Sequence, residues 1–411
     1  MTEEVVIVGA GIAGLATALA LERVGLRSVV LERAQDLRTT GAALTLFPNA
    51  WRALDALGVA HKLTPFYQPL QKGTVMNVST GVCQEISFSA VTDSEGMMGV
   101  RCVHRKFLLE VLAEELPPGT IRFSSKLVSI KTETLDDSSL VYLLHLDDGT
   151  IIKTKRLIGC DGVHSVVAQW LGLTKPIDSG RRAVRGLSVF PEGHGFPSEA
   201  QQFIGNGKRG AFLPVNDKEV YWFITLSSKL ELISSTKKEE MDRDPEVIKR
   251  EVMCHLAKDF PADYLNVVNH SELSTLSLAP LMFRLPWDLI FGCTNNGGVT
   301  VAGDAFHPMT PDLGQGGCAA LEDAVVLVRN IVNSQDNVAE GIKQYVFERR
   351  WRVMSLIIKA YVSGFIQQDH STTWWSAVKF FRDNIFYRFA YSKMFEVMKF
   401  DCGVLPIVKN E

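Results

Sequence analysis

The sequence predicts an α/β protein with two interleaved domains and helices at its C-terminal end. Three observations lead to this fold class. Residues 5–31 have the pattern of a strand–helix–strand unit, residues 176–285 hold scattered short strands, and the residues after 298 return to a strand followed by long helices. A glycine loop leads from strand to helix in the first and third stretches, so the chain is expected to leave one domain and come back to it.

The N-terminal unit is a Rossmann-like βαβ motif. Val5–Val8 forms the first strand, residues 12–24 carry apolar side chains at helical spacing up to Gly25, and residues 27–31 form the second strand. The intervening loop has G-x-G-x-x-G spacing, which places a dinucleotide on the helix N-terminus. Its residues are Gly9, Gly11, Ala13 and Gly14. Glu32 ends the second strand, where a carboxylate accepts hydrogen bonds from a ribose hydroxyl, so FAD or NAD is favoured over NADP.

Helices and hairpins are expected between residues 38 and 158. Pro48 opens a helix that ends at Gly58, and a second helix is expected over residues 100–116. Residues 121–158 read as antiparallel strands, with turns at residues 136–139 and at the DDGT sequence of residues 147–150.

The second half of the chain divides into a sheet-rich region and a helical region. The sheet-rich region is expected to hold strands at residues 183–189, 210–214 and 220–226 and a helix at residues 245–256. Beyond it, residues 299–302 form a strand of small residues, and helices are expected over residues 316–332 and 338–365. The predicted domains are a dinucleotide-binding domain of residues 1–75, 100–175 and 286–370, a smaller mixed β-sheet domain of residues 76–99 and 176–285, and a helical tail of residues 371–411.

Composition narrows the possible partners. A net charge of -3 from 43 basic and 46 acidic residues gives no extended basic field, so a small molecule is a better expectation than nucleic acid. The seven cysteines form no C-x-x-C pair and no Cys/His cluster at metal-ligand spacing, so no metal site is expected. A reducing compartment, the cytoplasm or an organelle stroma, fits this cysteine usage best.

Three motifs stand in order along the chain: G-x-G-x-x-G with Glu32, GCDGVHS at residues 159–165, and GDAFHP at residues 303–308 leading to GQGG at residues 314–317. With these motifs the sequence resembles the group A FAD-dependent monooxygenases, which have the para-hydroxybenzoate hydroxylase fold. The plant-type enzymes related to salicylate hydroxylase and zeaxanthin epoxidase are the most similar group. The resemblance spans about residues 4–350. It implies an FAD-binding domain interleaved with a substrate-binding sheet domain.

The resemblance also implies roles for individual residues. Asp304 binds the ribityl chain of FAD, Asp161 and Gly162 contact the pyrophosphate region, and the loop before residue 316 faces the pyrimidine edge of the flavin. From the residues alone, Asp304 as a turn cap and Arg38 and Arg105 as solvated charges are open alternatives. The predicted cofactor-binding residues are Gly9, Gly11, Ala13, Gly14, Glu32, Arg33, Arg38, Gly41, Ala42, Arg105, Asp161, Gly162, Gly303, Asp304, Pro308, Gly314, Gln315, Gly316 and Gly317.

No catalytic side chain is assigned. The family uses the His307–Pro308 segment to shape the flavin front, so His307 is expected to have a structural role and not that of a base. Two positions depart from the family pattern. Ala168 replaces a customary arginine, which bears on the pyrophosphate or NAD(P)H contact, and Cys318 stands where many relatives have asparagine and is expected to be a buried small side chain.

The resemblance implies an NAD(P)H-dependent flavoprotein monooxygenase. NADPH or NADH binds transiently and reduces FAD, O₂ adds at flavin C4a, and the hydroperoxide transfers one oxygen to the substrate by hydroxylation or epoxidation. The aromatic residues of the sheet-rich region predict an apolar or aromatic small molecule. The residues predicted to line its pocket are Phe212, Pro214, Trp222 and Leu46. Two alternatives keep FAD: a non-oxygenating oxidoreductase or oxidative cyclase on the same fold, and an FAD-bound interaction protein without turnover.

The C-terminal tail has its own pattern. Between residues 374 and 389 apolar side chains recur at helical spacing, with basic residues interspersed. Such a pattern is typical of a helix packed across the flavin domain, and also of a helix that lies on a membrane surface. Peripheral membrane contact through this segment is therefore an open alternative, while no uncharged run reaches transmembrane length.

Overall fold

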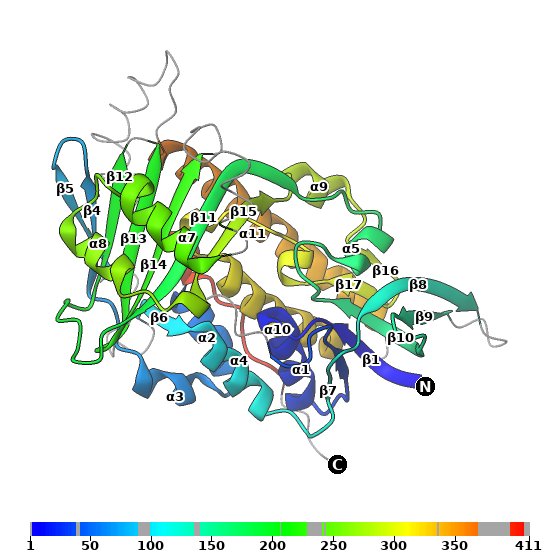
Figure 1. Cartoon of the computed structure of the whole chain (residues 1–411). Helices are drawn as coiled ribbons and strands as arrows, with labels where there is room; N and C mark the ends of the chain where they lie inside the picture. Colours follow the sequence, from blue (N-terminus) through cyan, green and yellow to red (C-terminus); the bar gives the residue numbers. More distant parts are fainter. Residues whose placement is uncertain are drawn as a thin grey trace.

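A computed structural model describes most of the chain. The described residues are 2–37, 42–88, 99–134, 140–205, 207–227, 241, 244–334, 337–368 and 395–406. Figure 1 shows two large sheets at opposite ends of the molecule, with helices α1 (Ile12–Arg23) and α10 (Gly316–Asn333) in the region between them. The predicted α/β fold class with interleaved segments is confirmed.

The first sheet is built around parallel strands. Among the described residues its order is β16–β17–β10–β1–β2–β7, and β9 and β8 extend from β10. The strands are β1 (Thr2–Val8), β2 (Val29–Leu31), β7 (Ile121–Arg122), β8 (Leu127–Thr134), β9 (Leu140–Leu146), β10 (Ile151–Gly159), β16 (Asn295–Asn296) and β17 (Val299–Val301).

Parallel register brings the sequence motifs to one edge of this sheet. Val8 at the end of β1 pairs with Leu31 of β2 and with Gly159 of β10, and Gly159 pairs with Val301 of β17. The residues that follow these four strand ends begin the G-x-G-x-x-G loop, the Glu32 position, the Asp161–Gly162 motif and the Gly303–Asp304 motif. In open α/β sheets the carboxyl ends of parallel strands are where ligands bind.

Two glycines of the first loop are required by close packing. A Cβ at Gly9, whose φ is +101°, would lie 2.5 Å from the carbonyl oxygen of Cys160, and one at Gly14 would lie 1.8 Å from the carbonyl oxygen of Gly9. These contacts let helix α1 start directly against the ends of β1 and β10. A Cβ at Gly11 would meet no atom within 4 Å, because that position faces open space.

The second sheet is mixed and has helices on one face. Its order among the described residues is β15–β11–β14–β13–β12–β4–β5, with β12 parallel to β4 and the other neighbours antiparallel. The strands are β4 (Lys72–Asn77), β5 (Cys83–Ser87), β11 (Ile177–Val189), β12 (Glu199–Gly205), β13 (Lys208–Asn216), β14 (Glu219–Ser227) and β15 (Ser277–Phe283). Helices α7 (Pro245–Glu251) and α8 (Ala262–Asn269) lie across this sheet in Figure 1. Since β4 starts at Lys72, the predicted boundary at residue 75 falls inside a strand.

The other described elements connect or cover the sheets. A small ribbon joins β3 (Ala43–Leu46) to β6 (Arg101–His104). The remaining helices used below are α2 (Pro48–Ala56), α4 (Arg105–Glu114), α5 (Val166–Trp170), α9 (Pro286–Phe291) and α11 (Val338–Gln367), with the single turns η4 (Gly303–Ala305) and η5 (Pro311–Leu313).

Two local predictions were wrong. Residues 101–104, expected to begin a helix, form β6 because they pair with β3, and the helix starts only at Arg105. The predicted antiparallel strand from residue 121 is divided in two: β7 pairs in parallel with β2, and Ser124 at φ 51° separates it from β8. The turn predicted at residues 136–139 and the helical pattern at residues 374–389 lie outside the described residues.

Candidate functional site

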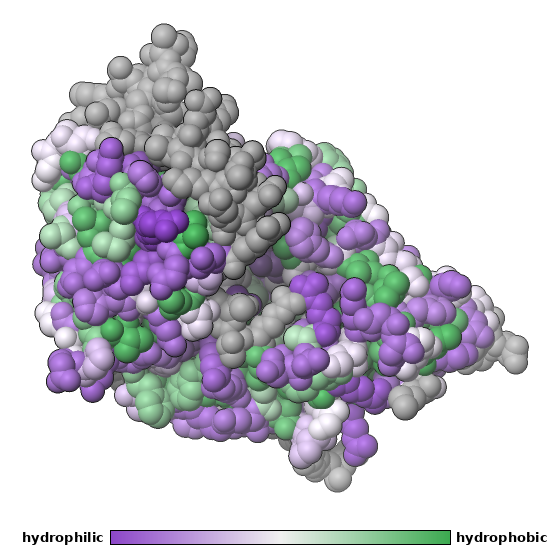
Figure 2. Space-filling view, in the orientation of Figure 1, coloured by the Kyte–Doolittle hydropathy of each residue, from purple (hydrophilic) through white to green (hydrophobic). Residues whose placement is uncertain are grey.

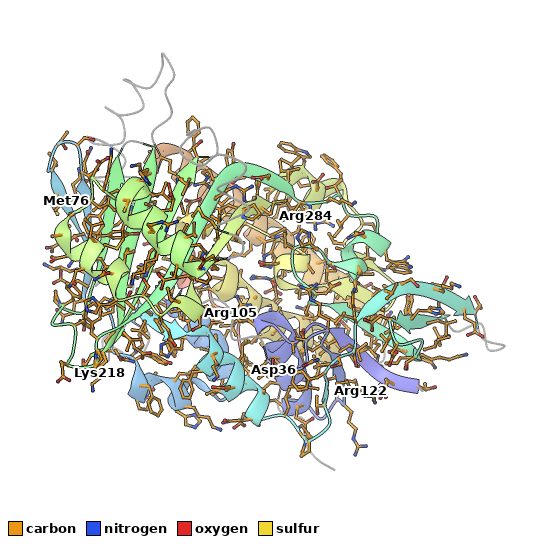
Figure 3. The ribbon with its side chains drawn as sticks, in the orientation of Figure 1. Asp36, Met76, Arg105, Arg122, Lys218 and Arg284 are labelled. Carbon is orange, nitrogen blue, oxygen red and sulfur yellow. The ribbon has the colours of Figure 1, made fainter. Side chains whose placement is uncertain are left out.

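A cavity of about 470 Å³ lies between the two sheets. One side is formed by the residues that follow β1, β2, β10 and β17, together with the first residues of α10. The opposite side is formed by β11 and β14 of the second sheet. In Figure 3, Arg105, which lines the cavity, is labelled between the second sheet and helix α1.

Most of the predicted cofactor residues meet in this cavity. Those that line it are Gly9, Gly11, Ala13, Glu32, Arg33, Ala42, Arg105, Asp161, Gly162, Gly303, Asp304, Gly314, Gly316 and Gly317. Gly14, Pro308 and Gln315 do not line it, and Arg38 and Gly41 lie outside the described residues. The cavity also takes in residues that the sequence did not single out for it, including Ser125, Lys126, Arg185, Tyr221, Met309 and Thr310.

Glu32 is buried beside the G-x-G-x-x-G loop. One carboxylate oxygen accepts the N–H of Ala10 at 2.8 Å and the other accepts the N–H of Ala34 at 2.9 Å. Each oxygen has a further lone pair, so the carboxylate can still accept a sugar hydroxyl from the cavity. The two backbone contacts fix its orientation before any ligand arrives.

The Asp161 carboxylate is also held by a backbone N–H group, but only one of its two oxygens has a hydrogen-bond partner among the described residues. Its Oδ2 accepts the N–H of Val166 at 2.6 Å at the start of α5, whereas its buried Oδ1 has no hydrogen-bond partner within the described part of the chain. Burial raises the pKa of this carboxyl, and the hydrogen bonds from Ser165 and Val166 oppose that shift. A buried acceptor without a partner at a cavity wall is a place for a ligand donor.

Asp304 lies next to the N-terminus of α10 at the cavity wall. The Asp304 side chain is exposed to the cavity, and one carboxylate oxygen lies 3.9 Å from where a Cβ of Gly316 would stand. Gly316 and Gly317, which have no side chains, begin the 18-residue helix α10 and line the cavity. The site therefore combines a sugar-hydroxyl acceptor with an electropositive helix end that suits an anionic ring edge.

Comparison with known proteins identifies this arrangement. A model of the FAD binding domain family matches residues 2–360. The chain belongs to this FAD-dependent monooxygenase family. It is 42% identical to Monooxygenase 2 of Arabidopsis thaliana, over 98% of each chain, and 39% identical to Monooxygenase 1 of the same plant, over 88% of this chain and 89% of that one. Its fold is similar to that of Klebsiella pneumoniae HpxO complexed with FAD and uric acid, with a TM-score of 0.81, 23% identity and 98% coverage of both chains.

The cofactor is therefore FAD, and the cavity fits it. The Gly9–Gly14 loop and Glu32 would hold the adenosine and pyrophosphate end, and the orphaned Oδ1 of Asp161 would accept a hydroxyl beside it. Asp304 and the start of α10 would hold the ribityl chain and the flavin edge. Ala168, the departure from the family pattern, is buried in α5, and its backbone N–H donates to Ser165 Oγ at 2.8 Å, a bond that any residue except proline could make.

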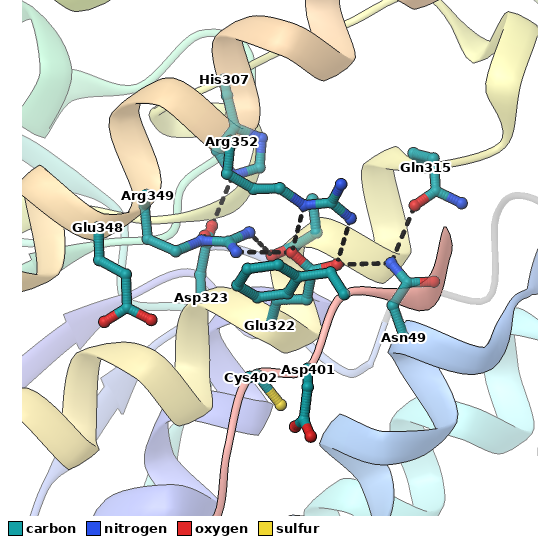
Figure 4. A network of polar contacts seen from close by, with 12 residues as sticks. Asn49, His307, Gln315, Glu322, Asp323, Glu348, Arg349, Arg352, Asp401 and Cys402 are labelled. Carbon is teal, nitrogen blue, oxygen red and sulfur yellow. Dashed lines mark hydrogen bonds and ion pairs between the residues drawn. The ribbon is translucent and has the colours of Figure 1, made fainter. Parts of the chain in front are cut away.

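His307 lies behind the FAD site in a buried charge network (Figure 4). Its Nε2 lies 2.6 Å from Asp323 Oδ2, and Asp323 Oδ1 accepts from Arg349 Nε at 2.8 Å. Arg349 also contacts Glu322 at 2.6 Å, and all four side chains have no solvent exposure. The structural role predicted for His307 agrees with this placement, since the ring does not line the cavity.

The same network reaches the glycine loop before α10. Asn49 of α2 donates to Gln315 Oε1 at 2.9 Å and to Glu322 Oε1 at 2.5 Å. The Gln315 side chain consequently faces α2 and not the cavity, although its glycine neighbours line it. Pro308 is also turned away: its carbonyl oxygen accepts the N–H of Arg284 at 3.0 Å. Cys318 is fully buried, as expected for a small packing side chain.

The substrate residues require a correction. Phe212 and Trp222 are fully buried in the core between the second sheet and helices α7 and α8, where Trp222 Nε1 donates to Ser271 at 2.8 Å. Leu46 and Pro214 are buried as well and do not line the cavity. Side chains alternate along a strand, so the cavity face of β14 carries Tyr221, Phe223 and Thr225 instead.

Arg185 is the charged residue of this wall. It lies on β11 opposite Phe223 of β14, and it lines the cavity together with Tyr221 and Ala183. No ion pair joins it to an acidic side chain in the described part of the chain. Burial raises the pKa of the Tyr221 hydroxyl, and the charge of Arg185 opposes this shift.

Proposed function

We propose that this FAD-dependent monooxygenase uses NAD(P)H and O₂ to hydroxylate or epoxidise an aromatic or apolar small molecule that carries an anionic group. The observation that carries the proposal is the wall opposite the flavin residues, where Arg185 lines the cavity together with the aromatic side chains of Tyr221 and Phe223. Flat aromatic side chains favour a flat apolar ring, and a guanidinium in an apolar setting favours a carboxylate or an oxyanion.

Each part of this wall has a separate task. Bound FAD supplies the electron transfer and the activation of dioxygen. Arg185 orients the substrate through its anionic group, and the protonated Tyr221 hydroxyl can donate a hydrogen bond to the same group or to a ring substituent. Phe223, Ala183 and Met309 keep water away from the reacting edge, which limits the loss of reducing equivalents as hydrogen peroxide.

The reaction class can be tested with the purified FAD-loaded enzyme. NADH or NADPH consumption and O₂ uptake are measured together over a panel of aromatic acids and their neutral carboxamide analogues, and the product masses are recorded. A substrate-stimulated gain of one oxygen supports the proposal. Product without oxygen gain would assign a non-oxygenating oxidoreductase or cyclase, and no stimulation by any compound would favour a protein without turnover.

The substrate class is tested at Arg185. Arg185→Gln should raise KM for anionic substrates by about 10- to 100-fold, because a charge-assisted hydrogen bond contributes roughly 1.5–3 kcal/mol. KM for the carboxamides should change little. Arg182→Gln is the matched control, since Arg182 lies on the same strand and does not line the cavity. Equal effects of Arg185→Gln on anionic and neutral substrates would contradict the proposed anion contact.

A further inference from the structure

Helices α9 and α11 present large apolar side chains to solvent. On α11, Phe347 is 70% exposed and Trp351 55%, and Ile358 and Val362 follow on the same helix. On α9, Trp287 is 54% exposed and Phe291 85%. These six side chains define the α9–α11 face. Single exposed apolar residues are common on proteins, but a contiguous group of aromatic ones marks a surface that binds something.

Helical spacing gathers the α11 residues into one stripe. Positions 347, 351, 358 and 362 lie within about one third of the helix circumference at 100° per residue. The opposite side of α11 is also apolar, because Tyr345, Val353 and Ile357 are buried in the core. A surface helix normally turns polar side chains to water, so packing within the described chain does not explain the outer stripe.

Helix α9 lies beside α11 and adds further apolar side chains to this surface. The two helices pack against each other, and the Phe283 ring just before α9 lies 5.0 Å from the Tyr361 ring of α11. In Figure 2, which has the orientation of Figure 1, hydrophobic atoms are seen at the surface where α9 lies. The aromatic residues of α9 therefore belong to the same surface as those of α11.

Most charges on α11 beside the stripe are positive, since its Glu348 is paired with Arg329, while α9 carries one acidic residue, Asp288. After Glu348, α11 contains Arg349, Arg350, Arg352 and Lys359 and no acidic residue. Arg349 and Arg352 are neutralised by Glu322 and Asp323 of α10. Arg350 and Lys359, both partly exposed, make no ion pair with an acidic side chain in the described part of the chain. Arg350 donates to the Thr294 hydroxyl at 3.5 Å, a neutral partner, so both side chains keep their positive charge beside the aromatic surface.

We propose that the α9–α11 face binds the surface of an anionic lipid bilayer. Aromatic side chains flanked by lysine and arginine are the composition of helices that lie in the bilayer interface. Among the described helices, none is long and apolar enough to cross a bilayer. A second copy of the chain is a poorer occupant, because pairing two α11 stripes would bring the basic groups Arg350 and Lys359 of both copies close together.

Co-sedimentation of the full FAD-loaded chain with vesicles tests this inference. The vesicles are phosphatidylcholine alone or phosphatidylcholine with phosphatidylserine. We expect sedimentation with the anionic vesicles, weakened about tenfold in Phe347→Ser/Trp351→Ser, because two aromatic side chains no longer leave water. Arg350→Gln/Lys359→Gln should reduce the preference for phosphatidylserine. The control is Phe66→Ser/Val128→Ser, since both of these exposed side chains, 62% and 53%, lie on other elements.

Flavin absorbance and thermal unfolding of each variant show that it is folded and loaded, and light scattering after gel filtration gives its oligomeric state. Three results would overturn the inference. One is wild-type protein that stays in the supernatant with both kinds of vesicle. Another is unchanged sedimentation of the aromatic double variant, which would place the contact elsewhere. The third is a wild-type dimer that this variant converts to a monomer without any vesicle binding, which would assign the face to a second copy. None of these outcomes depends on the substrate proposed above.

Discussion

The buried carboxylate of Asp323 accepts the backbone N–H of Gly303 at 2.8 Å. Asp323 lies on α10, and Gly303 opens the turn η4 that carries Asp304 into the FAD cavity. A fully buried ion-pair network, which joins Asp323 to Arg349 of α11, thus fixes the cofactor loop from behind. The fixed position of the loop is a property of the protein and does not depend on bound FAD.

Replacing Asp323 should destabilise the protein. Asp323→Asn leaves Arg349 with one fewer buried counter-charge, and removing one partner of a buried pair costs about 3–5 kcal/mol. Chemical unfolding followed by circular dichroism measures this loss. Asp55→Asn, at an exposed position of α2, is the control and should change the free energy of unfolding little. A similar stability of the two variants would contradict the structural importance of the network.

Acid should lower the free energy of unfolding of the wild type by protonating the Asp323 carboxylate. Burial alone would raise the pKa of Asp323, but the charges of His307 and Arg349 outweigh it and leave that pKa lowered. A carboxyl whose pKa is lower in the folded state stabilises the fold above its unfolded value, about 3.9, and loses this contribution as pH falls through the folded value. Unfolding free energy measured from pH 6 to about pH 3 should therefore fall less steeply in Asp323→Asn than in the wild type.

Asp304 should contribute to FAD affinity without supporting the fold. Its carboxylate is exposed to the cavity, so Asp304→Ala removes an acceptor for a sugar hydroxyl and leaves no buried group unpaired. Loss of a hydrogen bond to a charged group corresponds to about a 10- to 100-fold rise in the FAD dissociation constant. Titration of the apo-protein by flavin fluorescence measures it, with Asp55→Ala as the control. Wild-type affinity in Asp304→Ala would remove this residue from the site.

The location of the cofactor cavity could be predicted from the sequence because the motifs sit at strand ends. Gly9, Glu32, Asp161 and Gly303 are far apart along the chain, but parallel pairing of short buried strands allows only one edge for all of them. The glycine positions also indicate the location of the cavity, since Gly9 and Gly14 permit close backbone contacts at the strand ends that any side chain would block.

The substrate wall and the charge network could not be predicted in this way. Both faces of β14 carry aromatic side chains and both are largely buried, so the sequence does not show which face lines the cavity, and the packing of α7 and α8 shows that Trp222 faces the core. Asp323 and Arg349 lie on separate helices, and their burial depends on how α10 and α11 pack. Charged residues on helices are usually exposed to solvent, so the burial of these two could not be predicted without the position of the neighbouring helix.

Substitution of Gly11 should affect cofactor binding, whereas substitution of Gly14 should affect the stability of the fold. A Cβ at Gly11 meets no atom within 4 Å and its φ of -81° suits alanine, so Gly11→Ala should keep the thermal stability of the apo-protein. The added methyl group enters the cavity, and FAD affinity should fall by about tenfold or more through lost backbone approach. Gly14→Ala would force a contact of 1.8 Å with the carbonyl oxygen of Gly9 and should lower apo-protein stability by about 1–3 kcal/mol. Equal behaviour of the two variants in both assays would contradict the placement of the loop.

Phe223 and Trp222 are neighbours on β14 with opposite surroundings, and their substitution should affect different properties. Phe223→Ala enlarges the cavity, so KM for the substrate and the fraction of NAD(P)H converted to hydrogen peroxide should rise, while the free energy of unfolding should fall less than in Trp222→Ala because Phe223 is only partly buried. Trp222→Ala creates a void in the core beside Tyr264 and should cost about 3–5 kcal/mol. Trp222→Phe, a milder change, is measured in case the alanine variant does not fold, and it should lower stability without a change in substrate preference. A shift in substrate preference caused by Trp222→Phe, with none caused by Phe223→Ala, would reverse the assignment of the two faces.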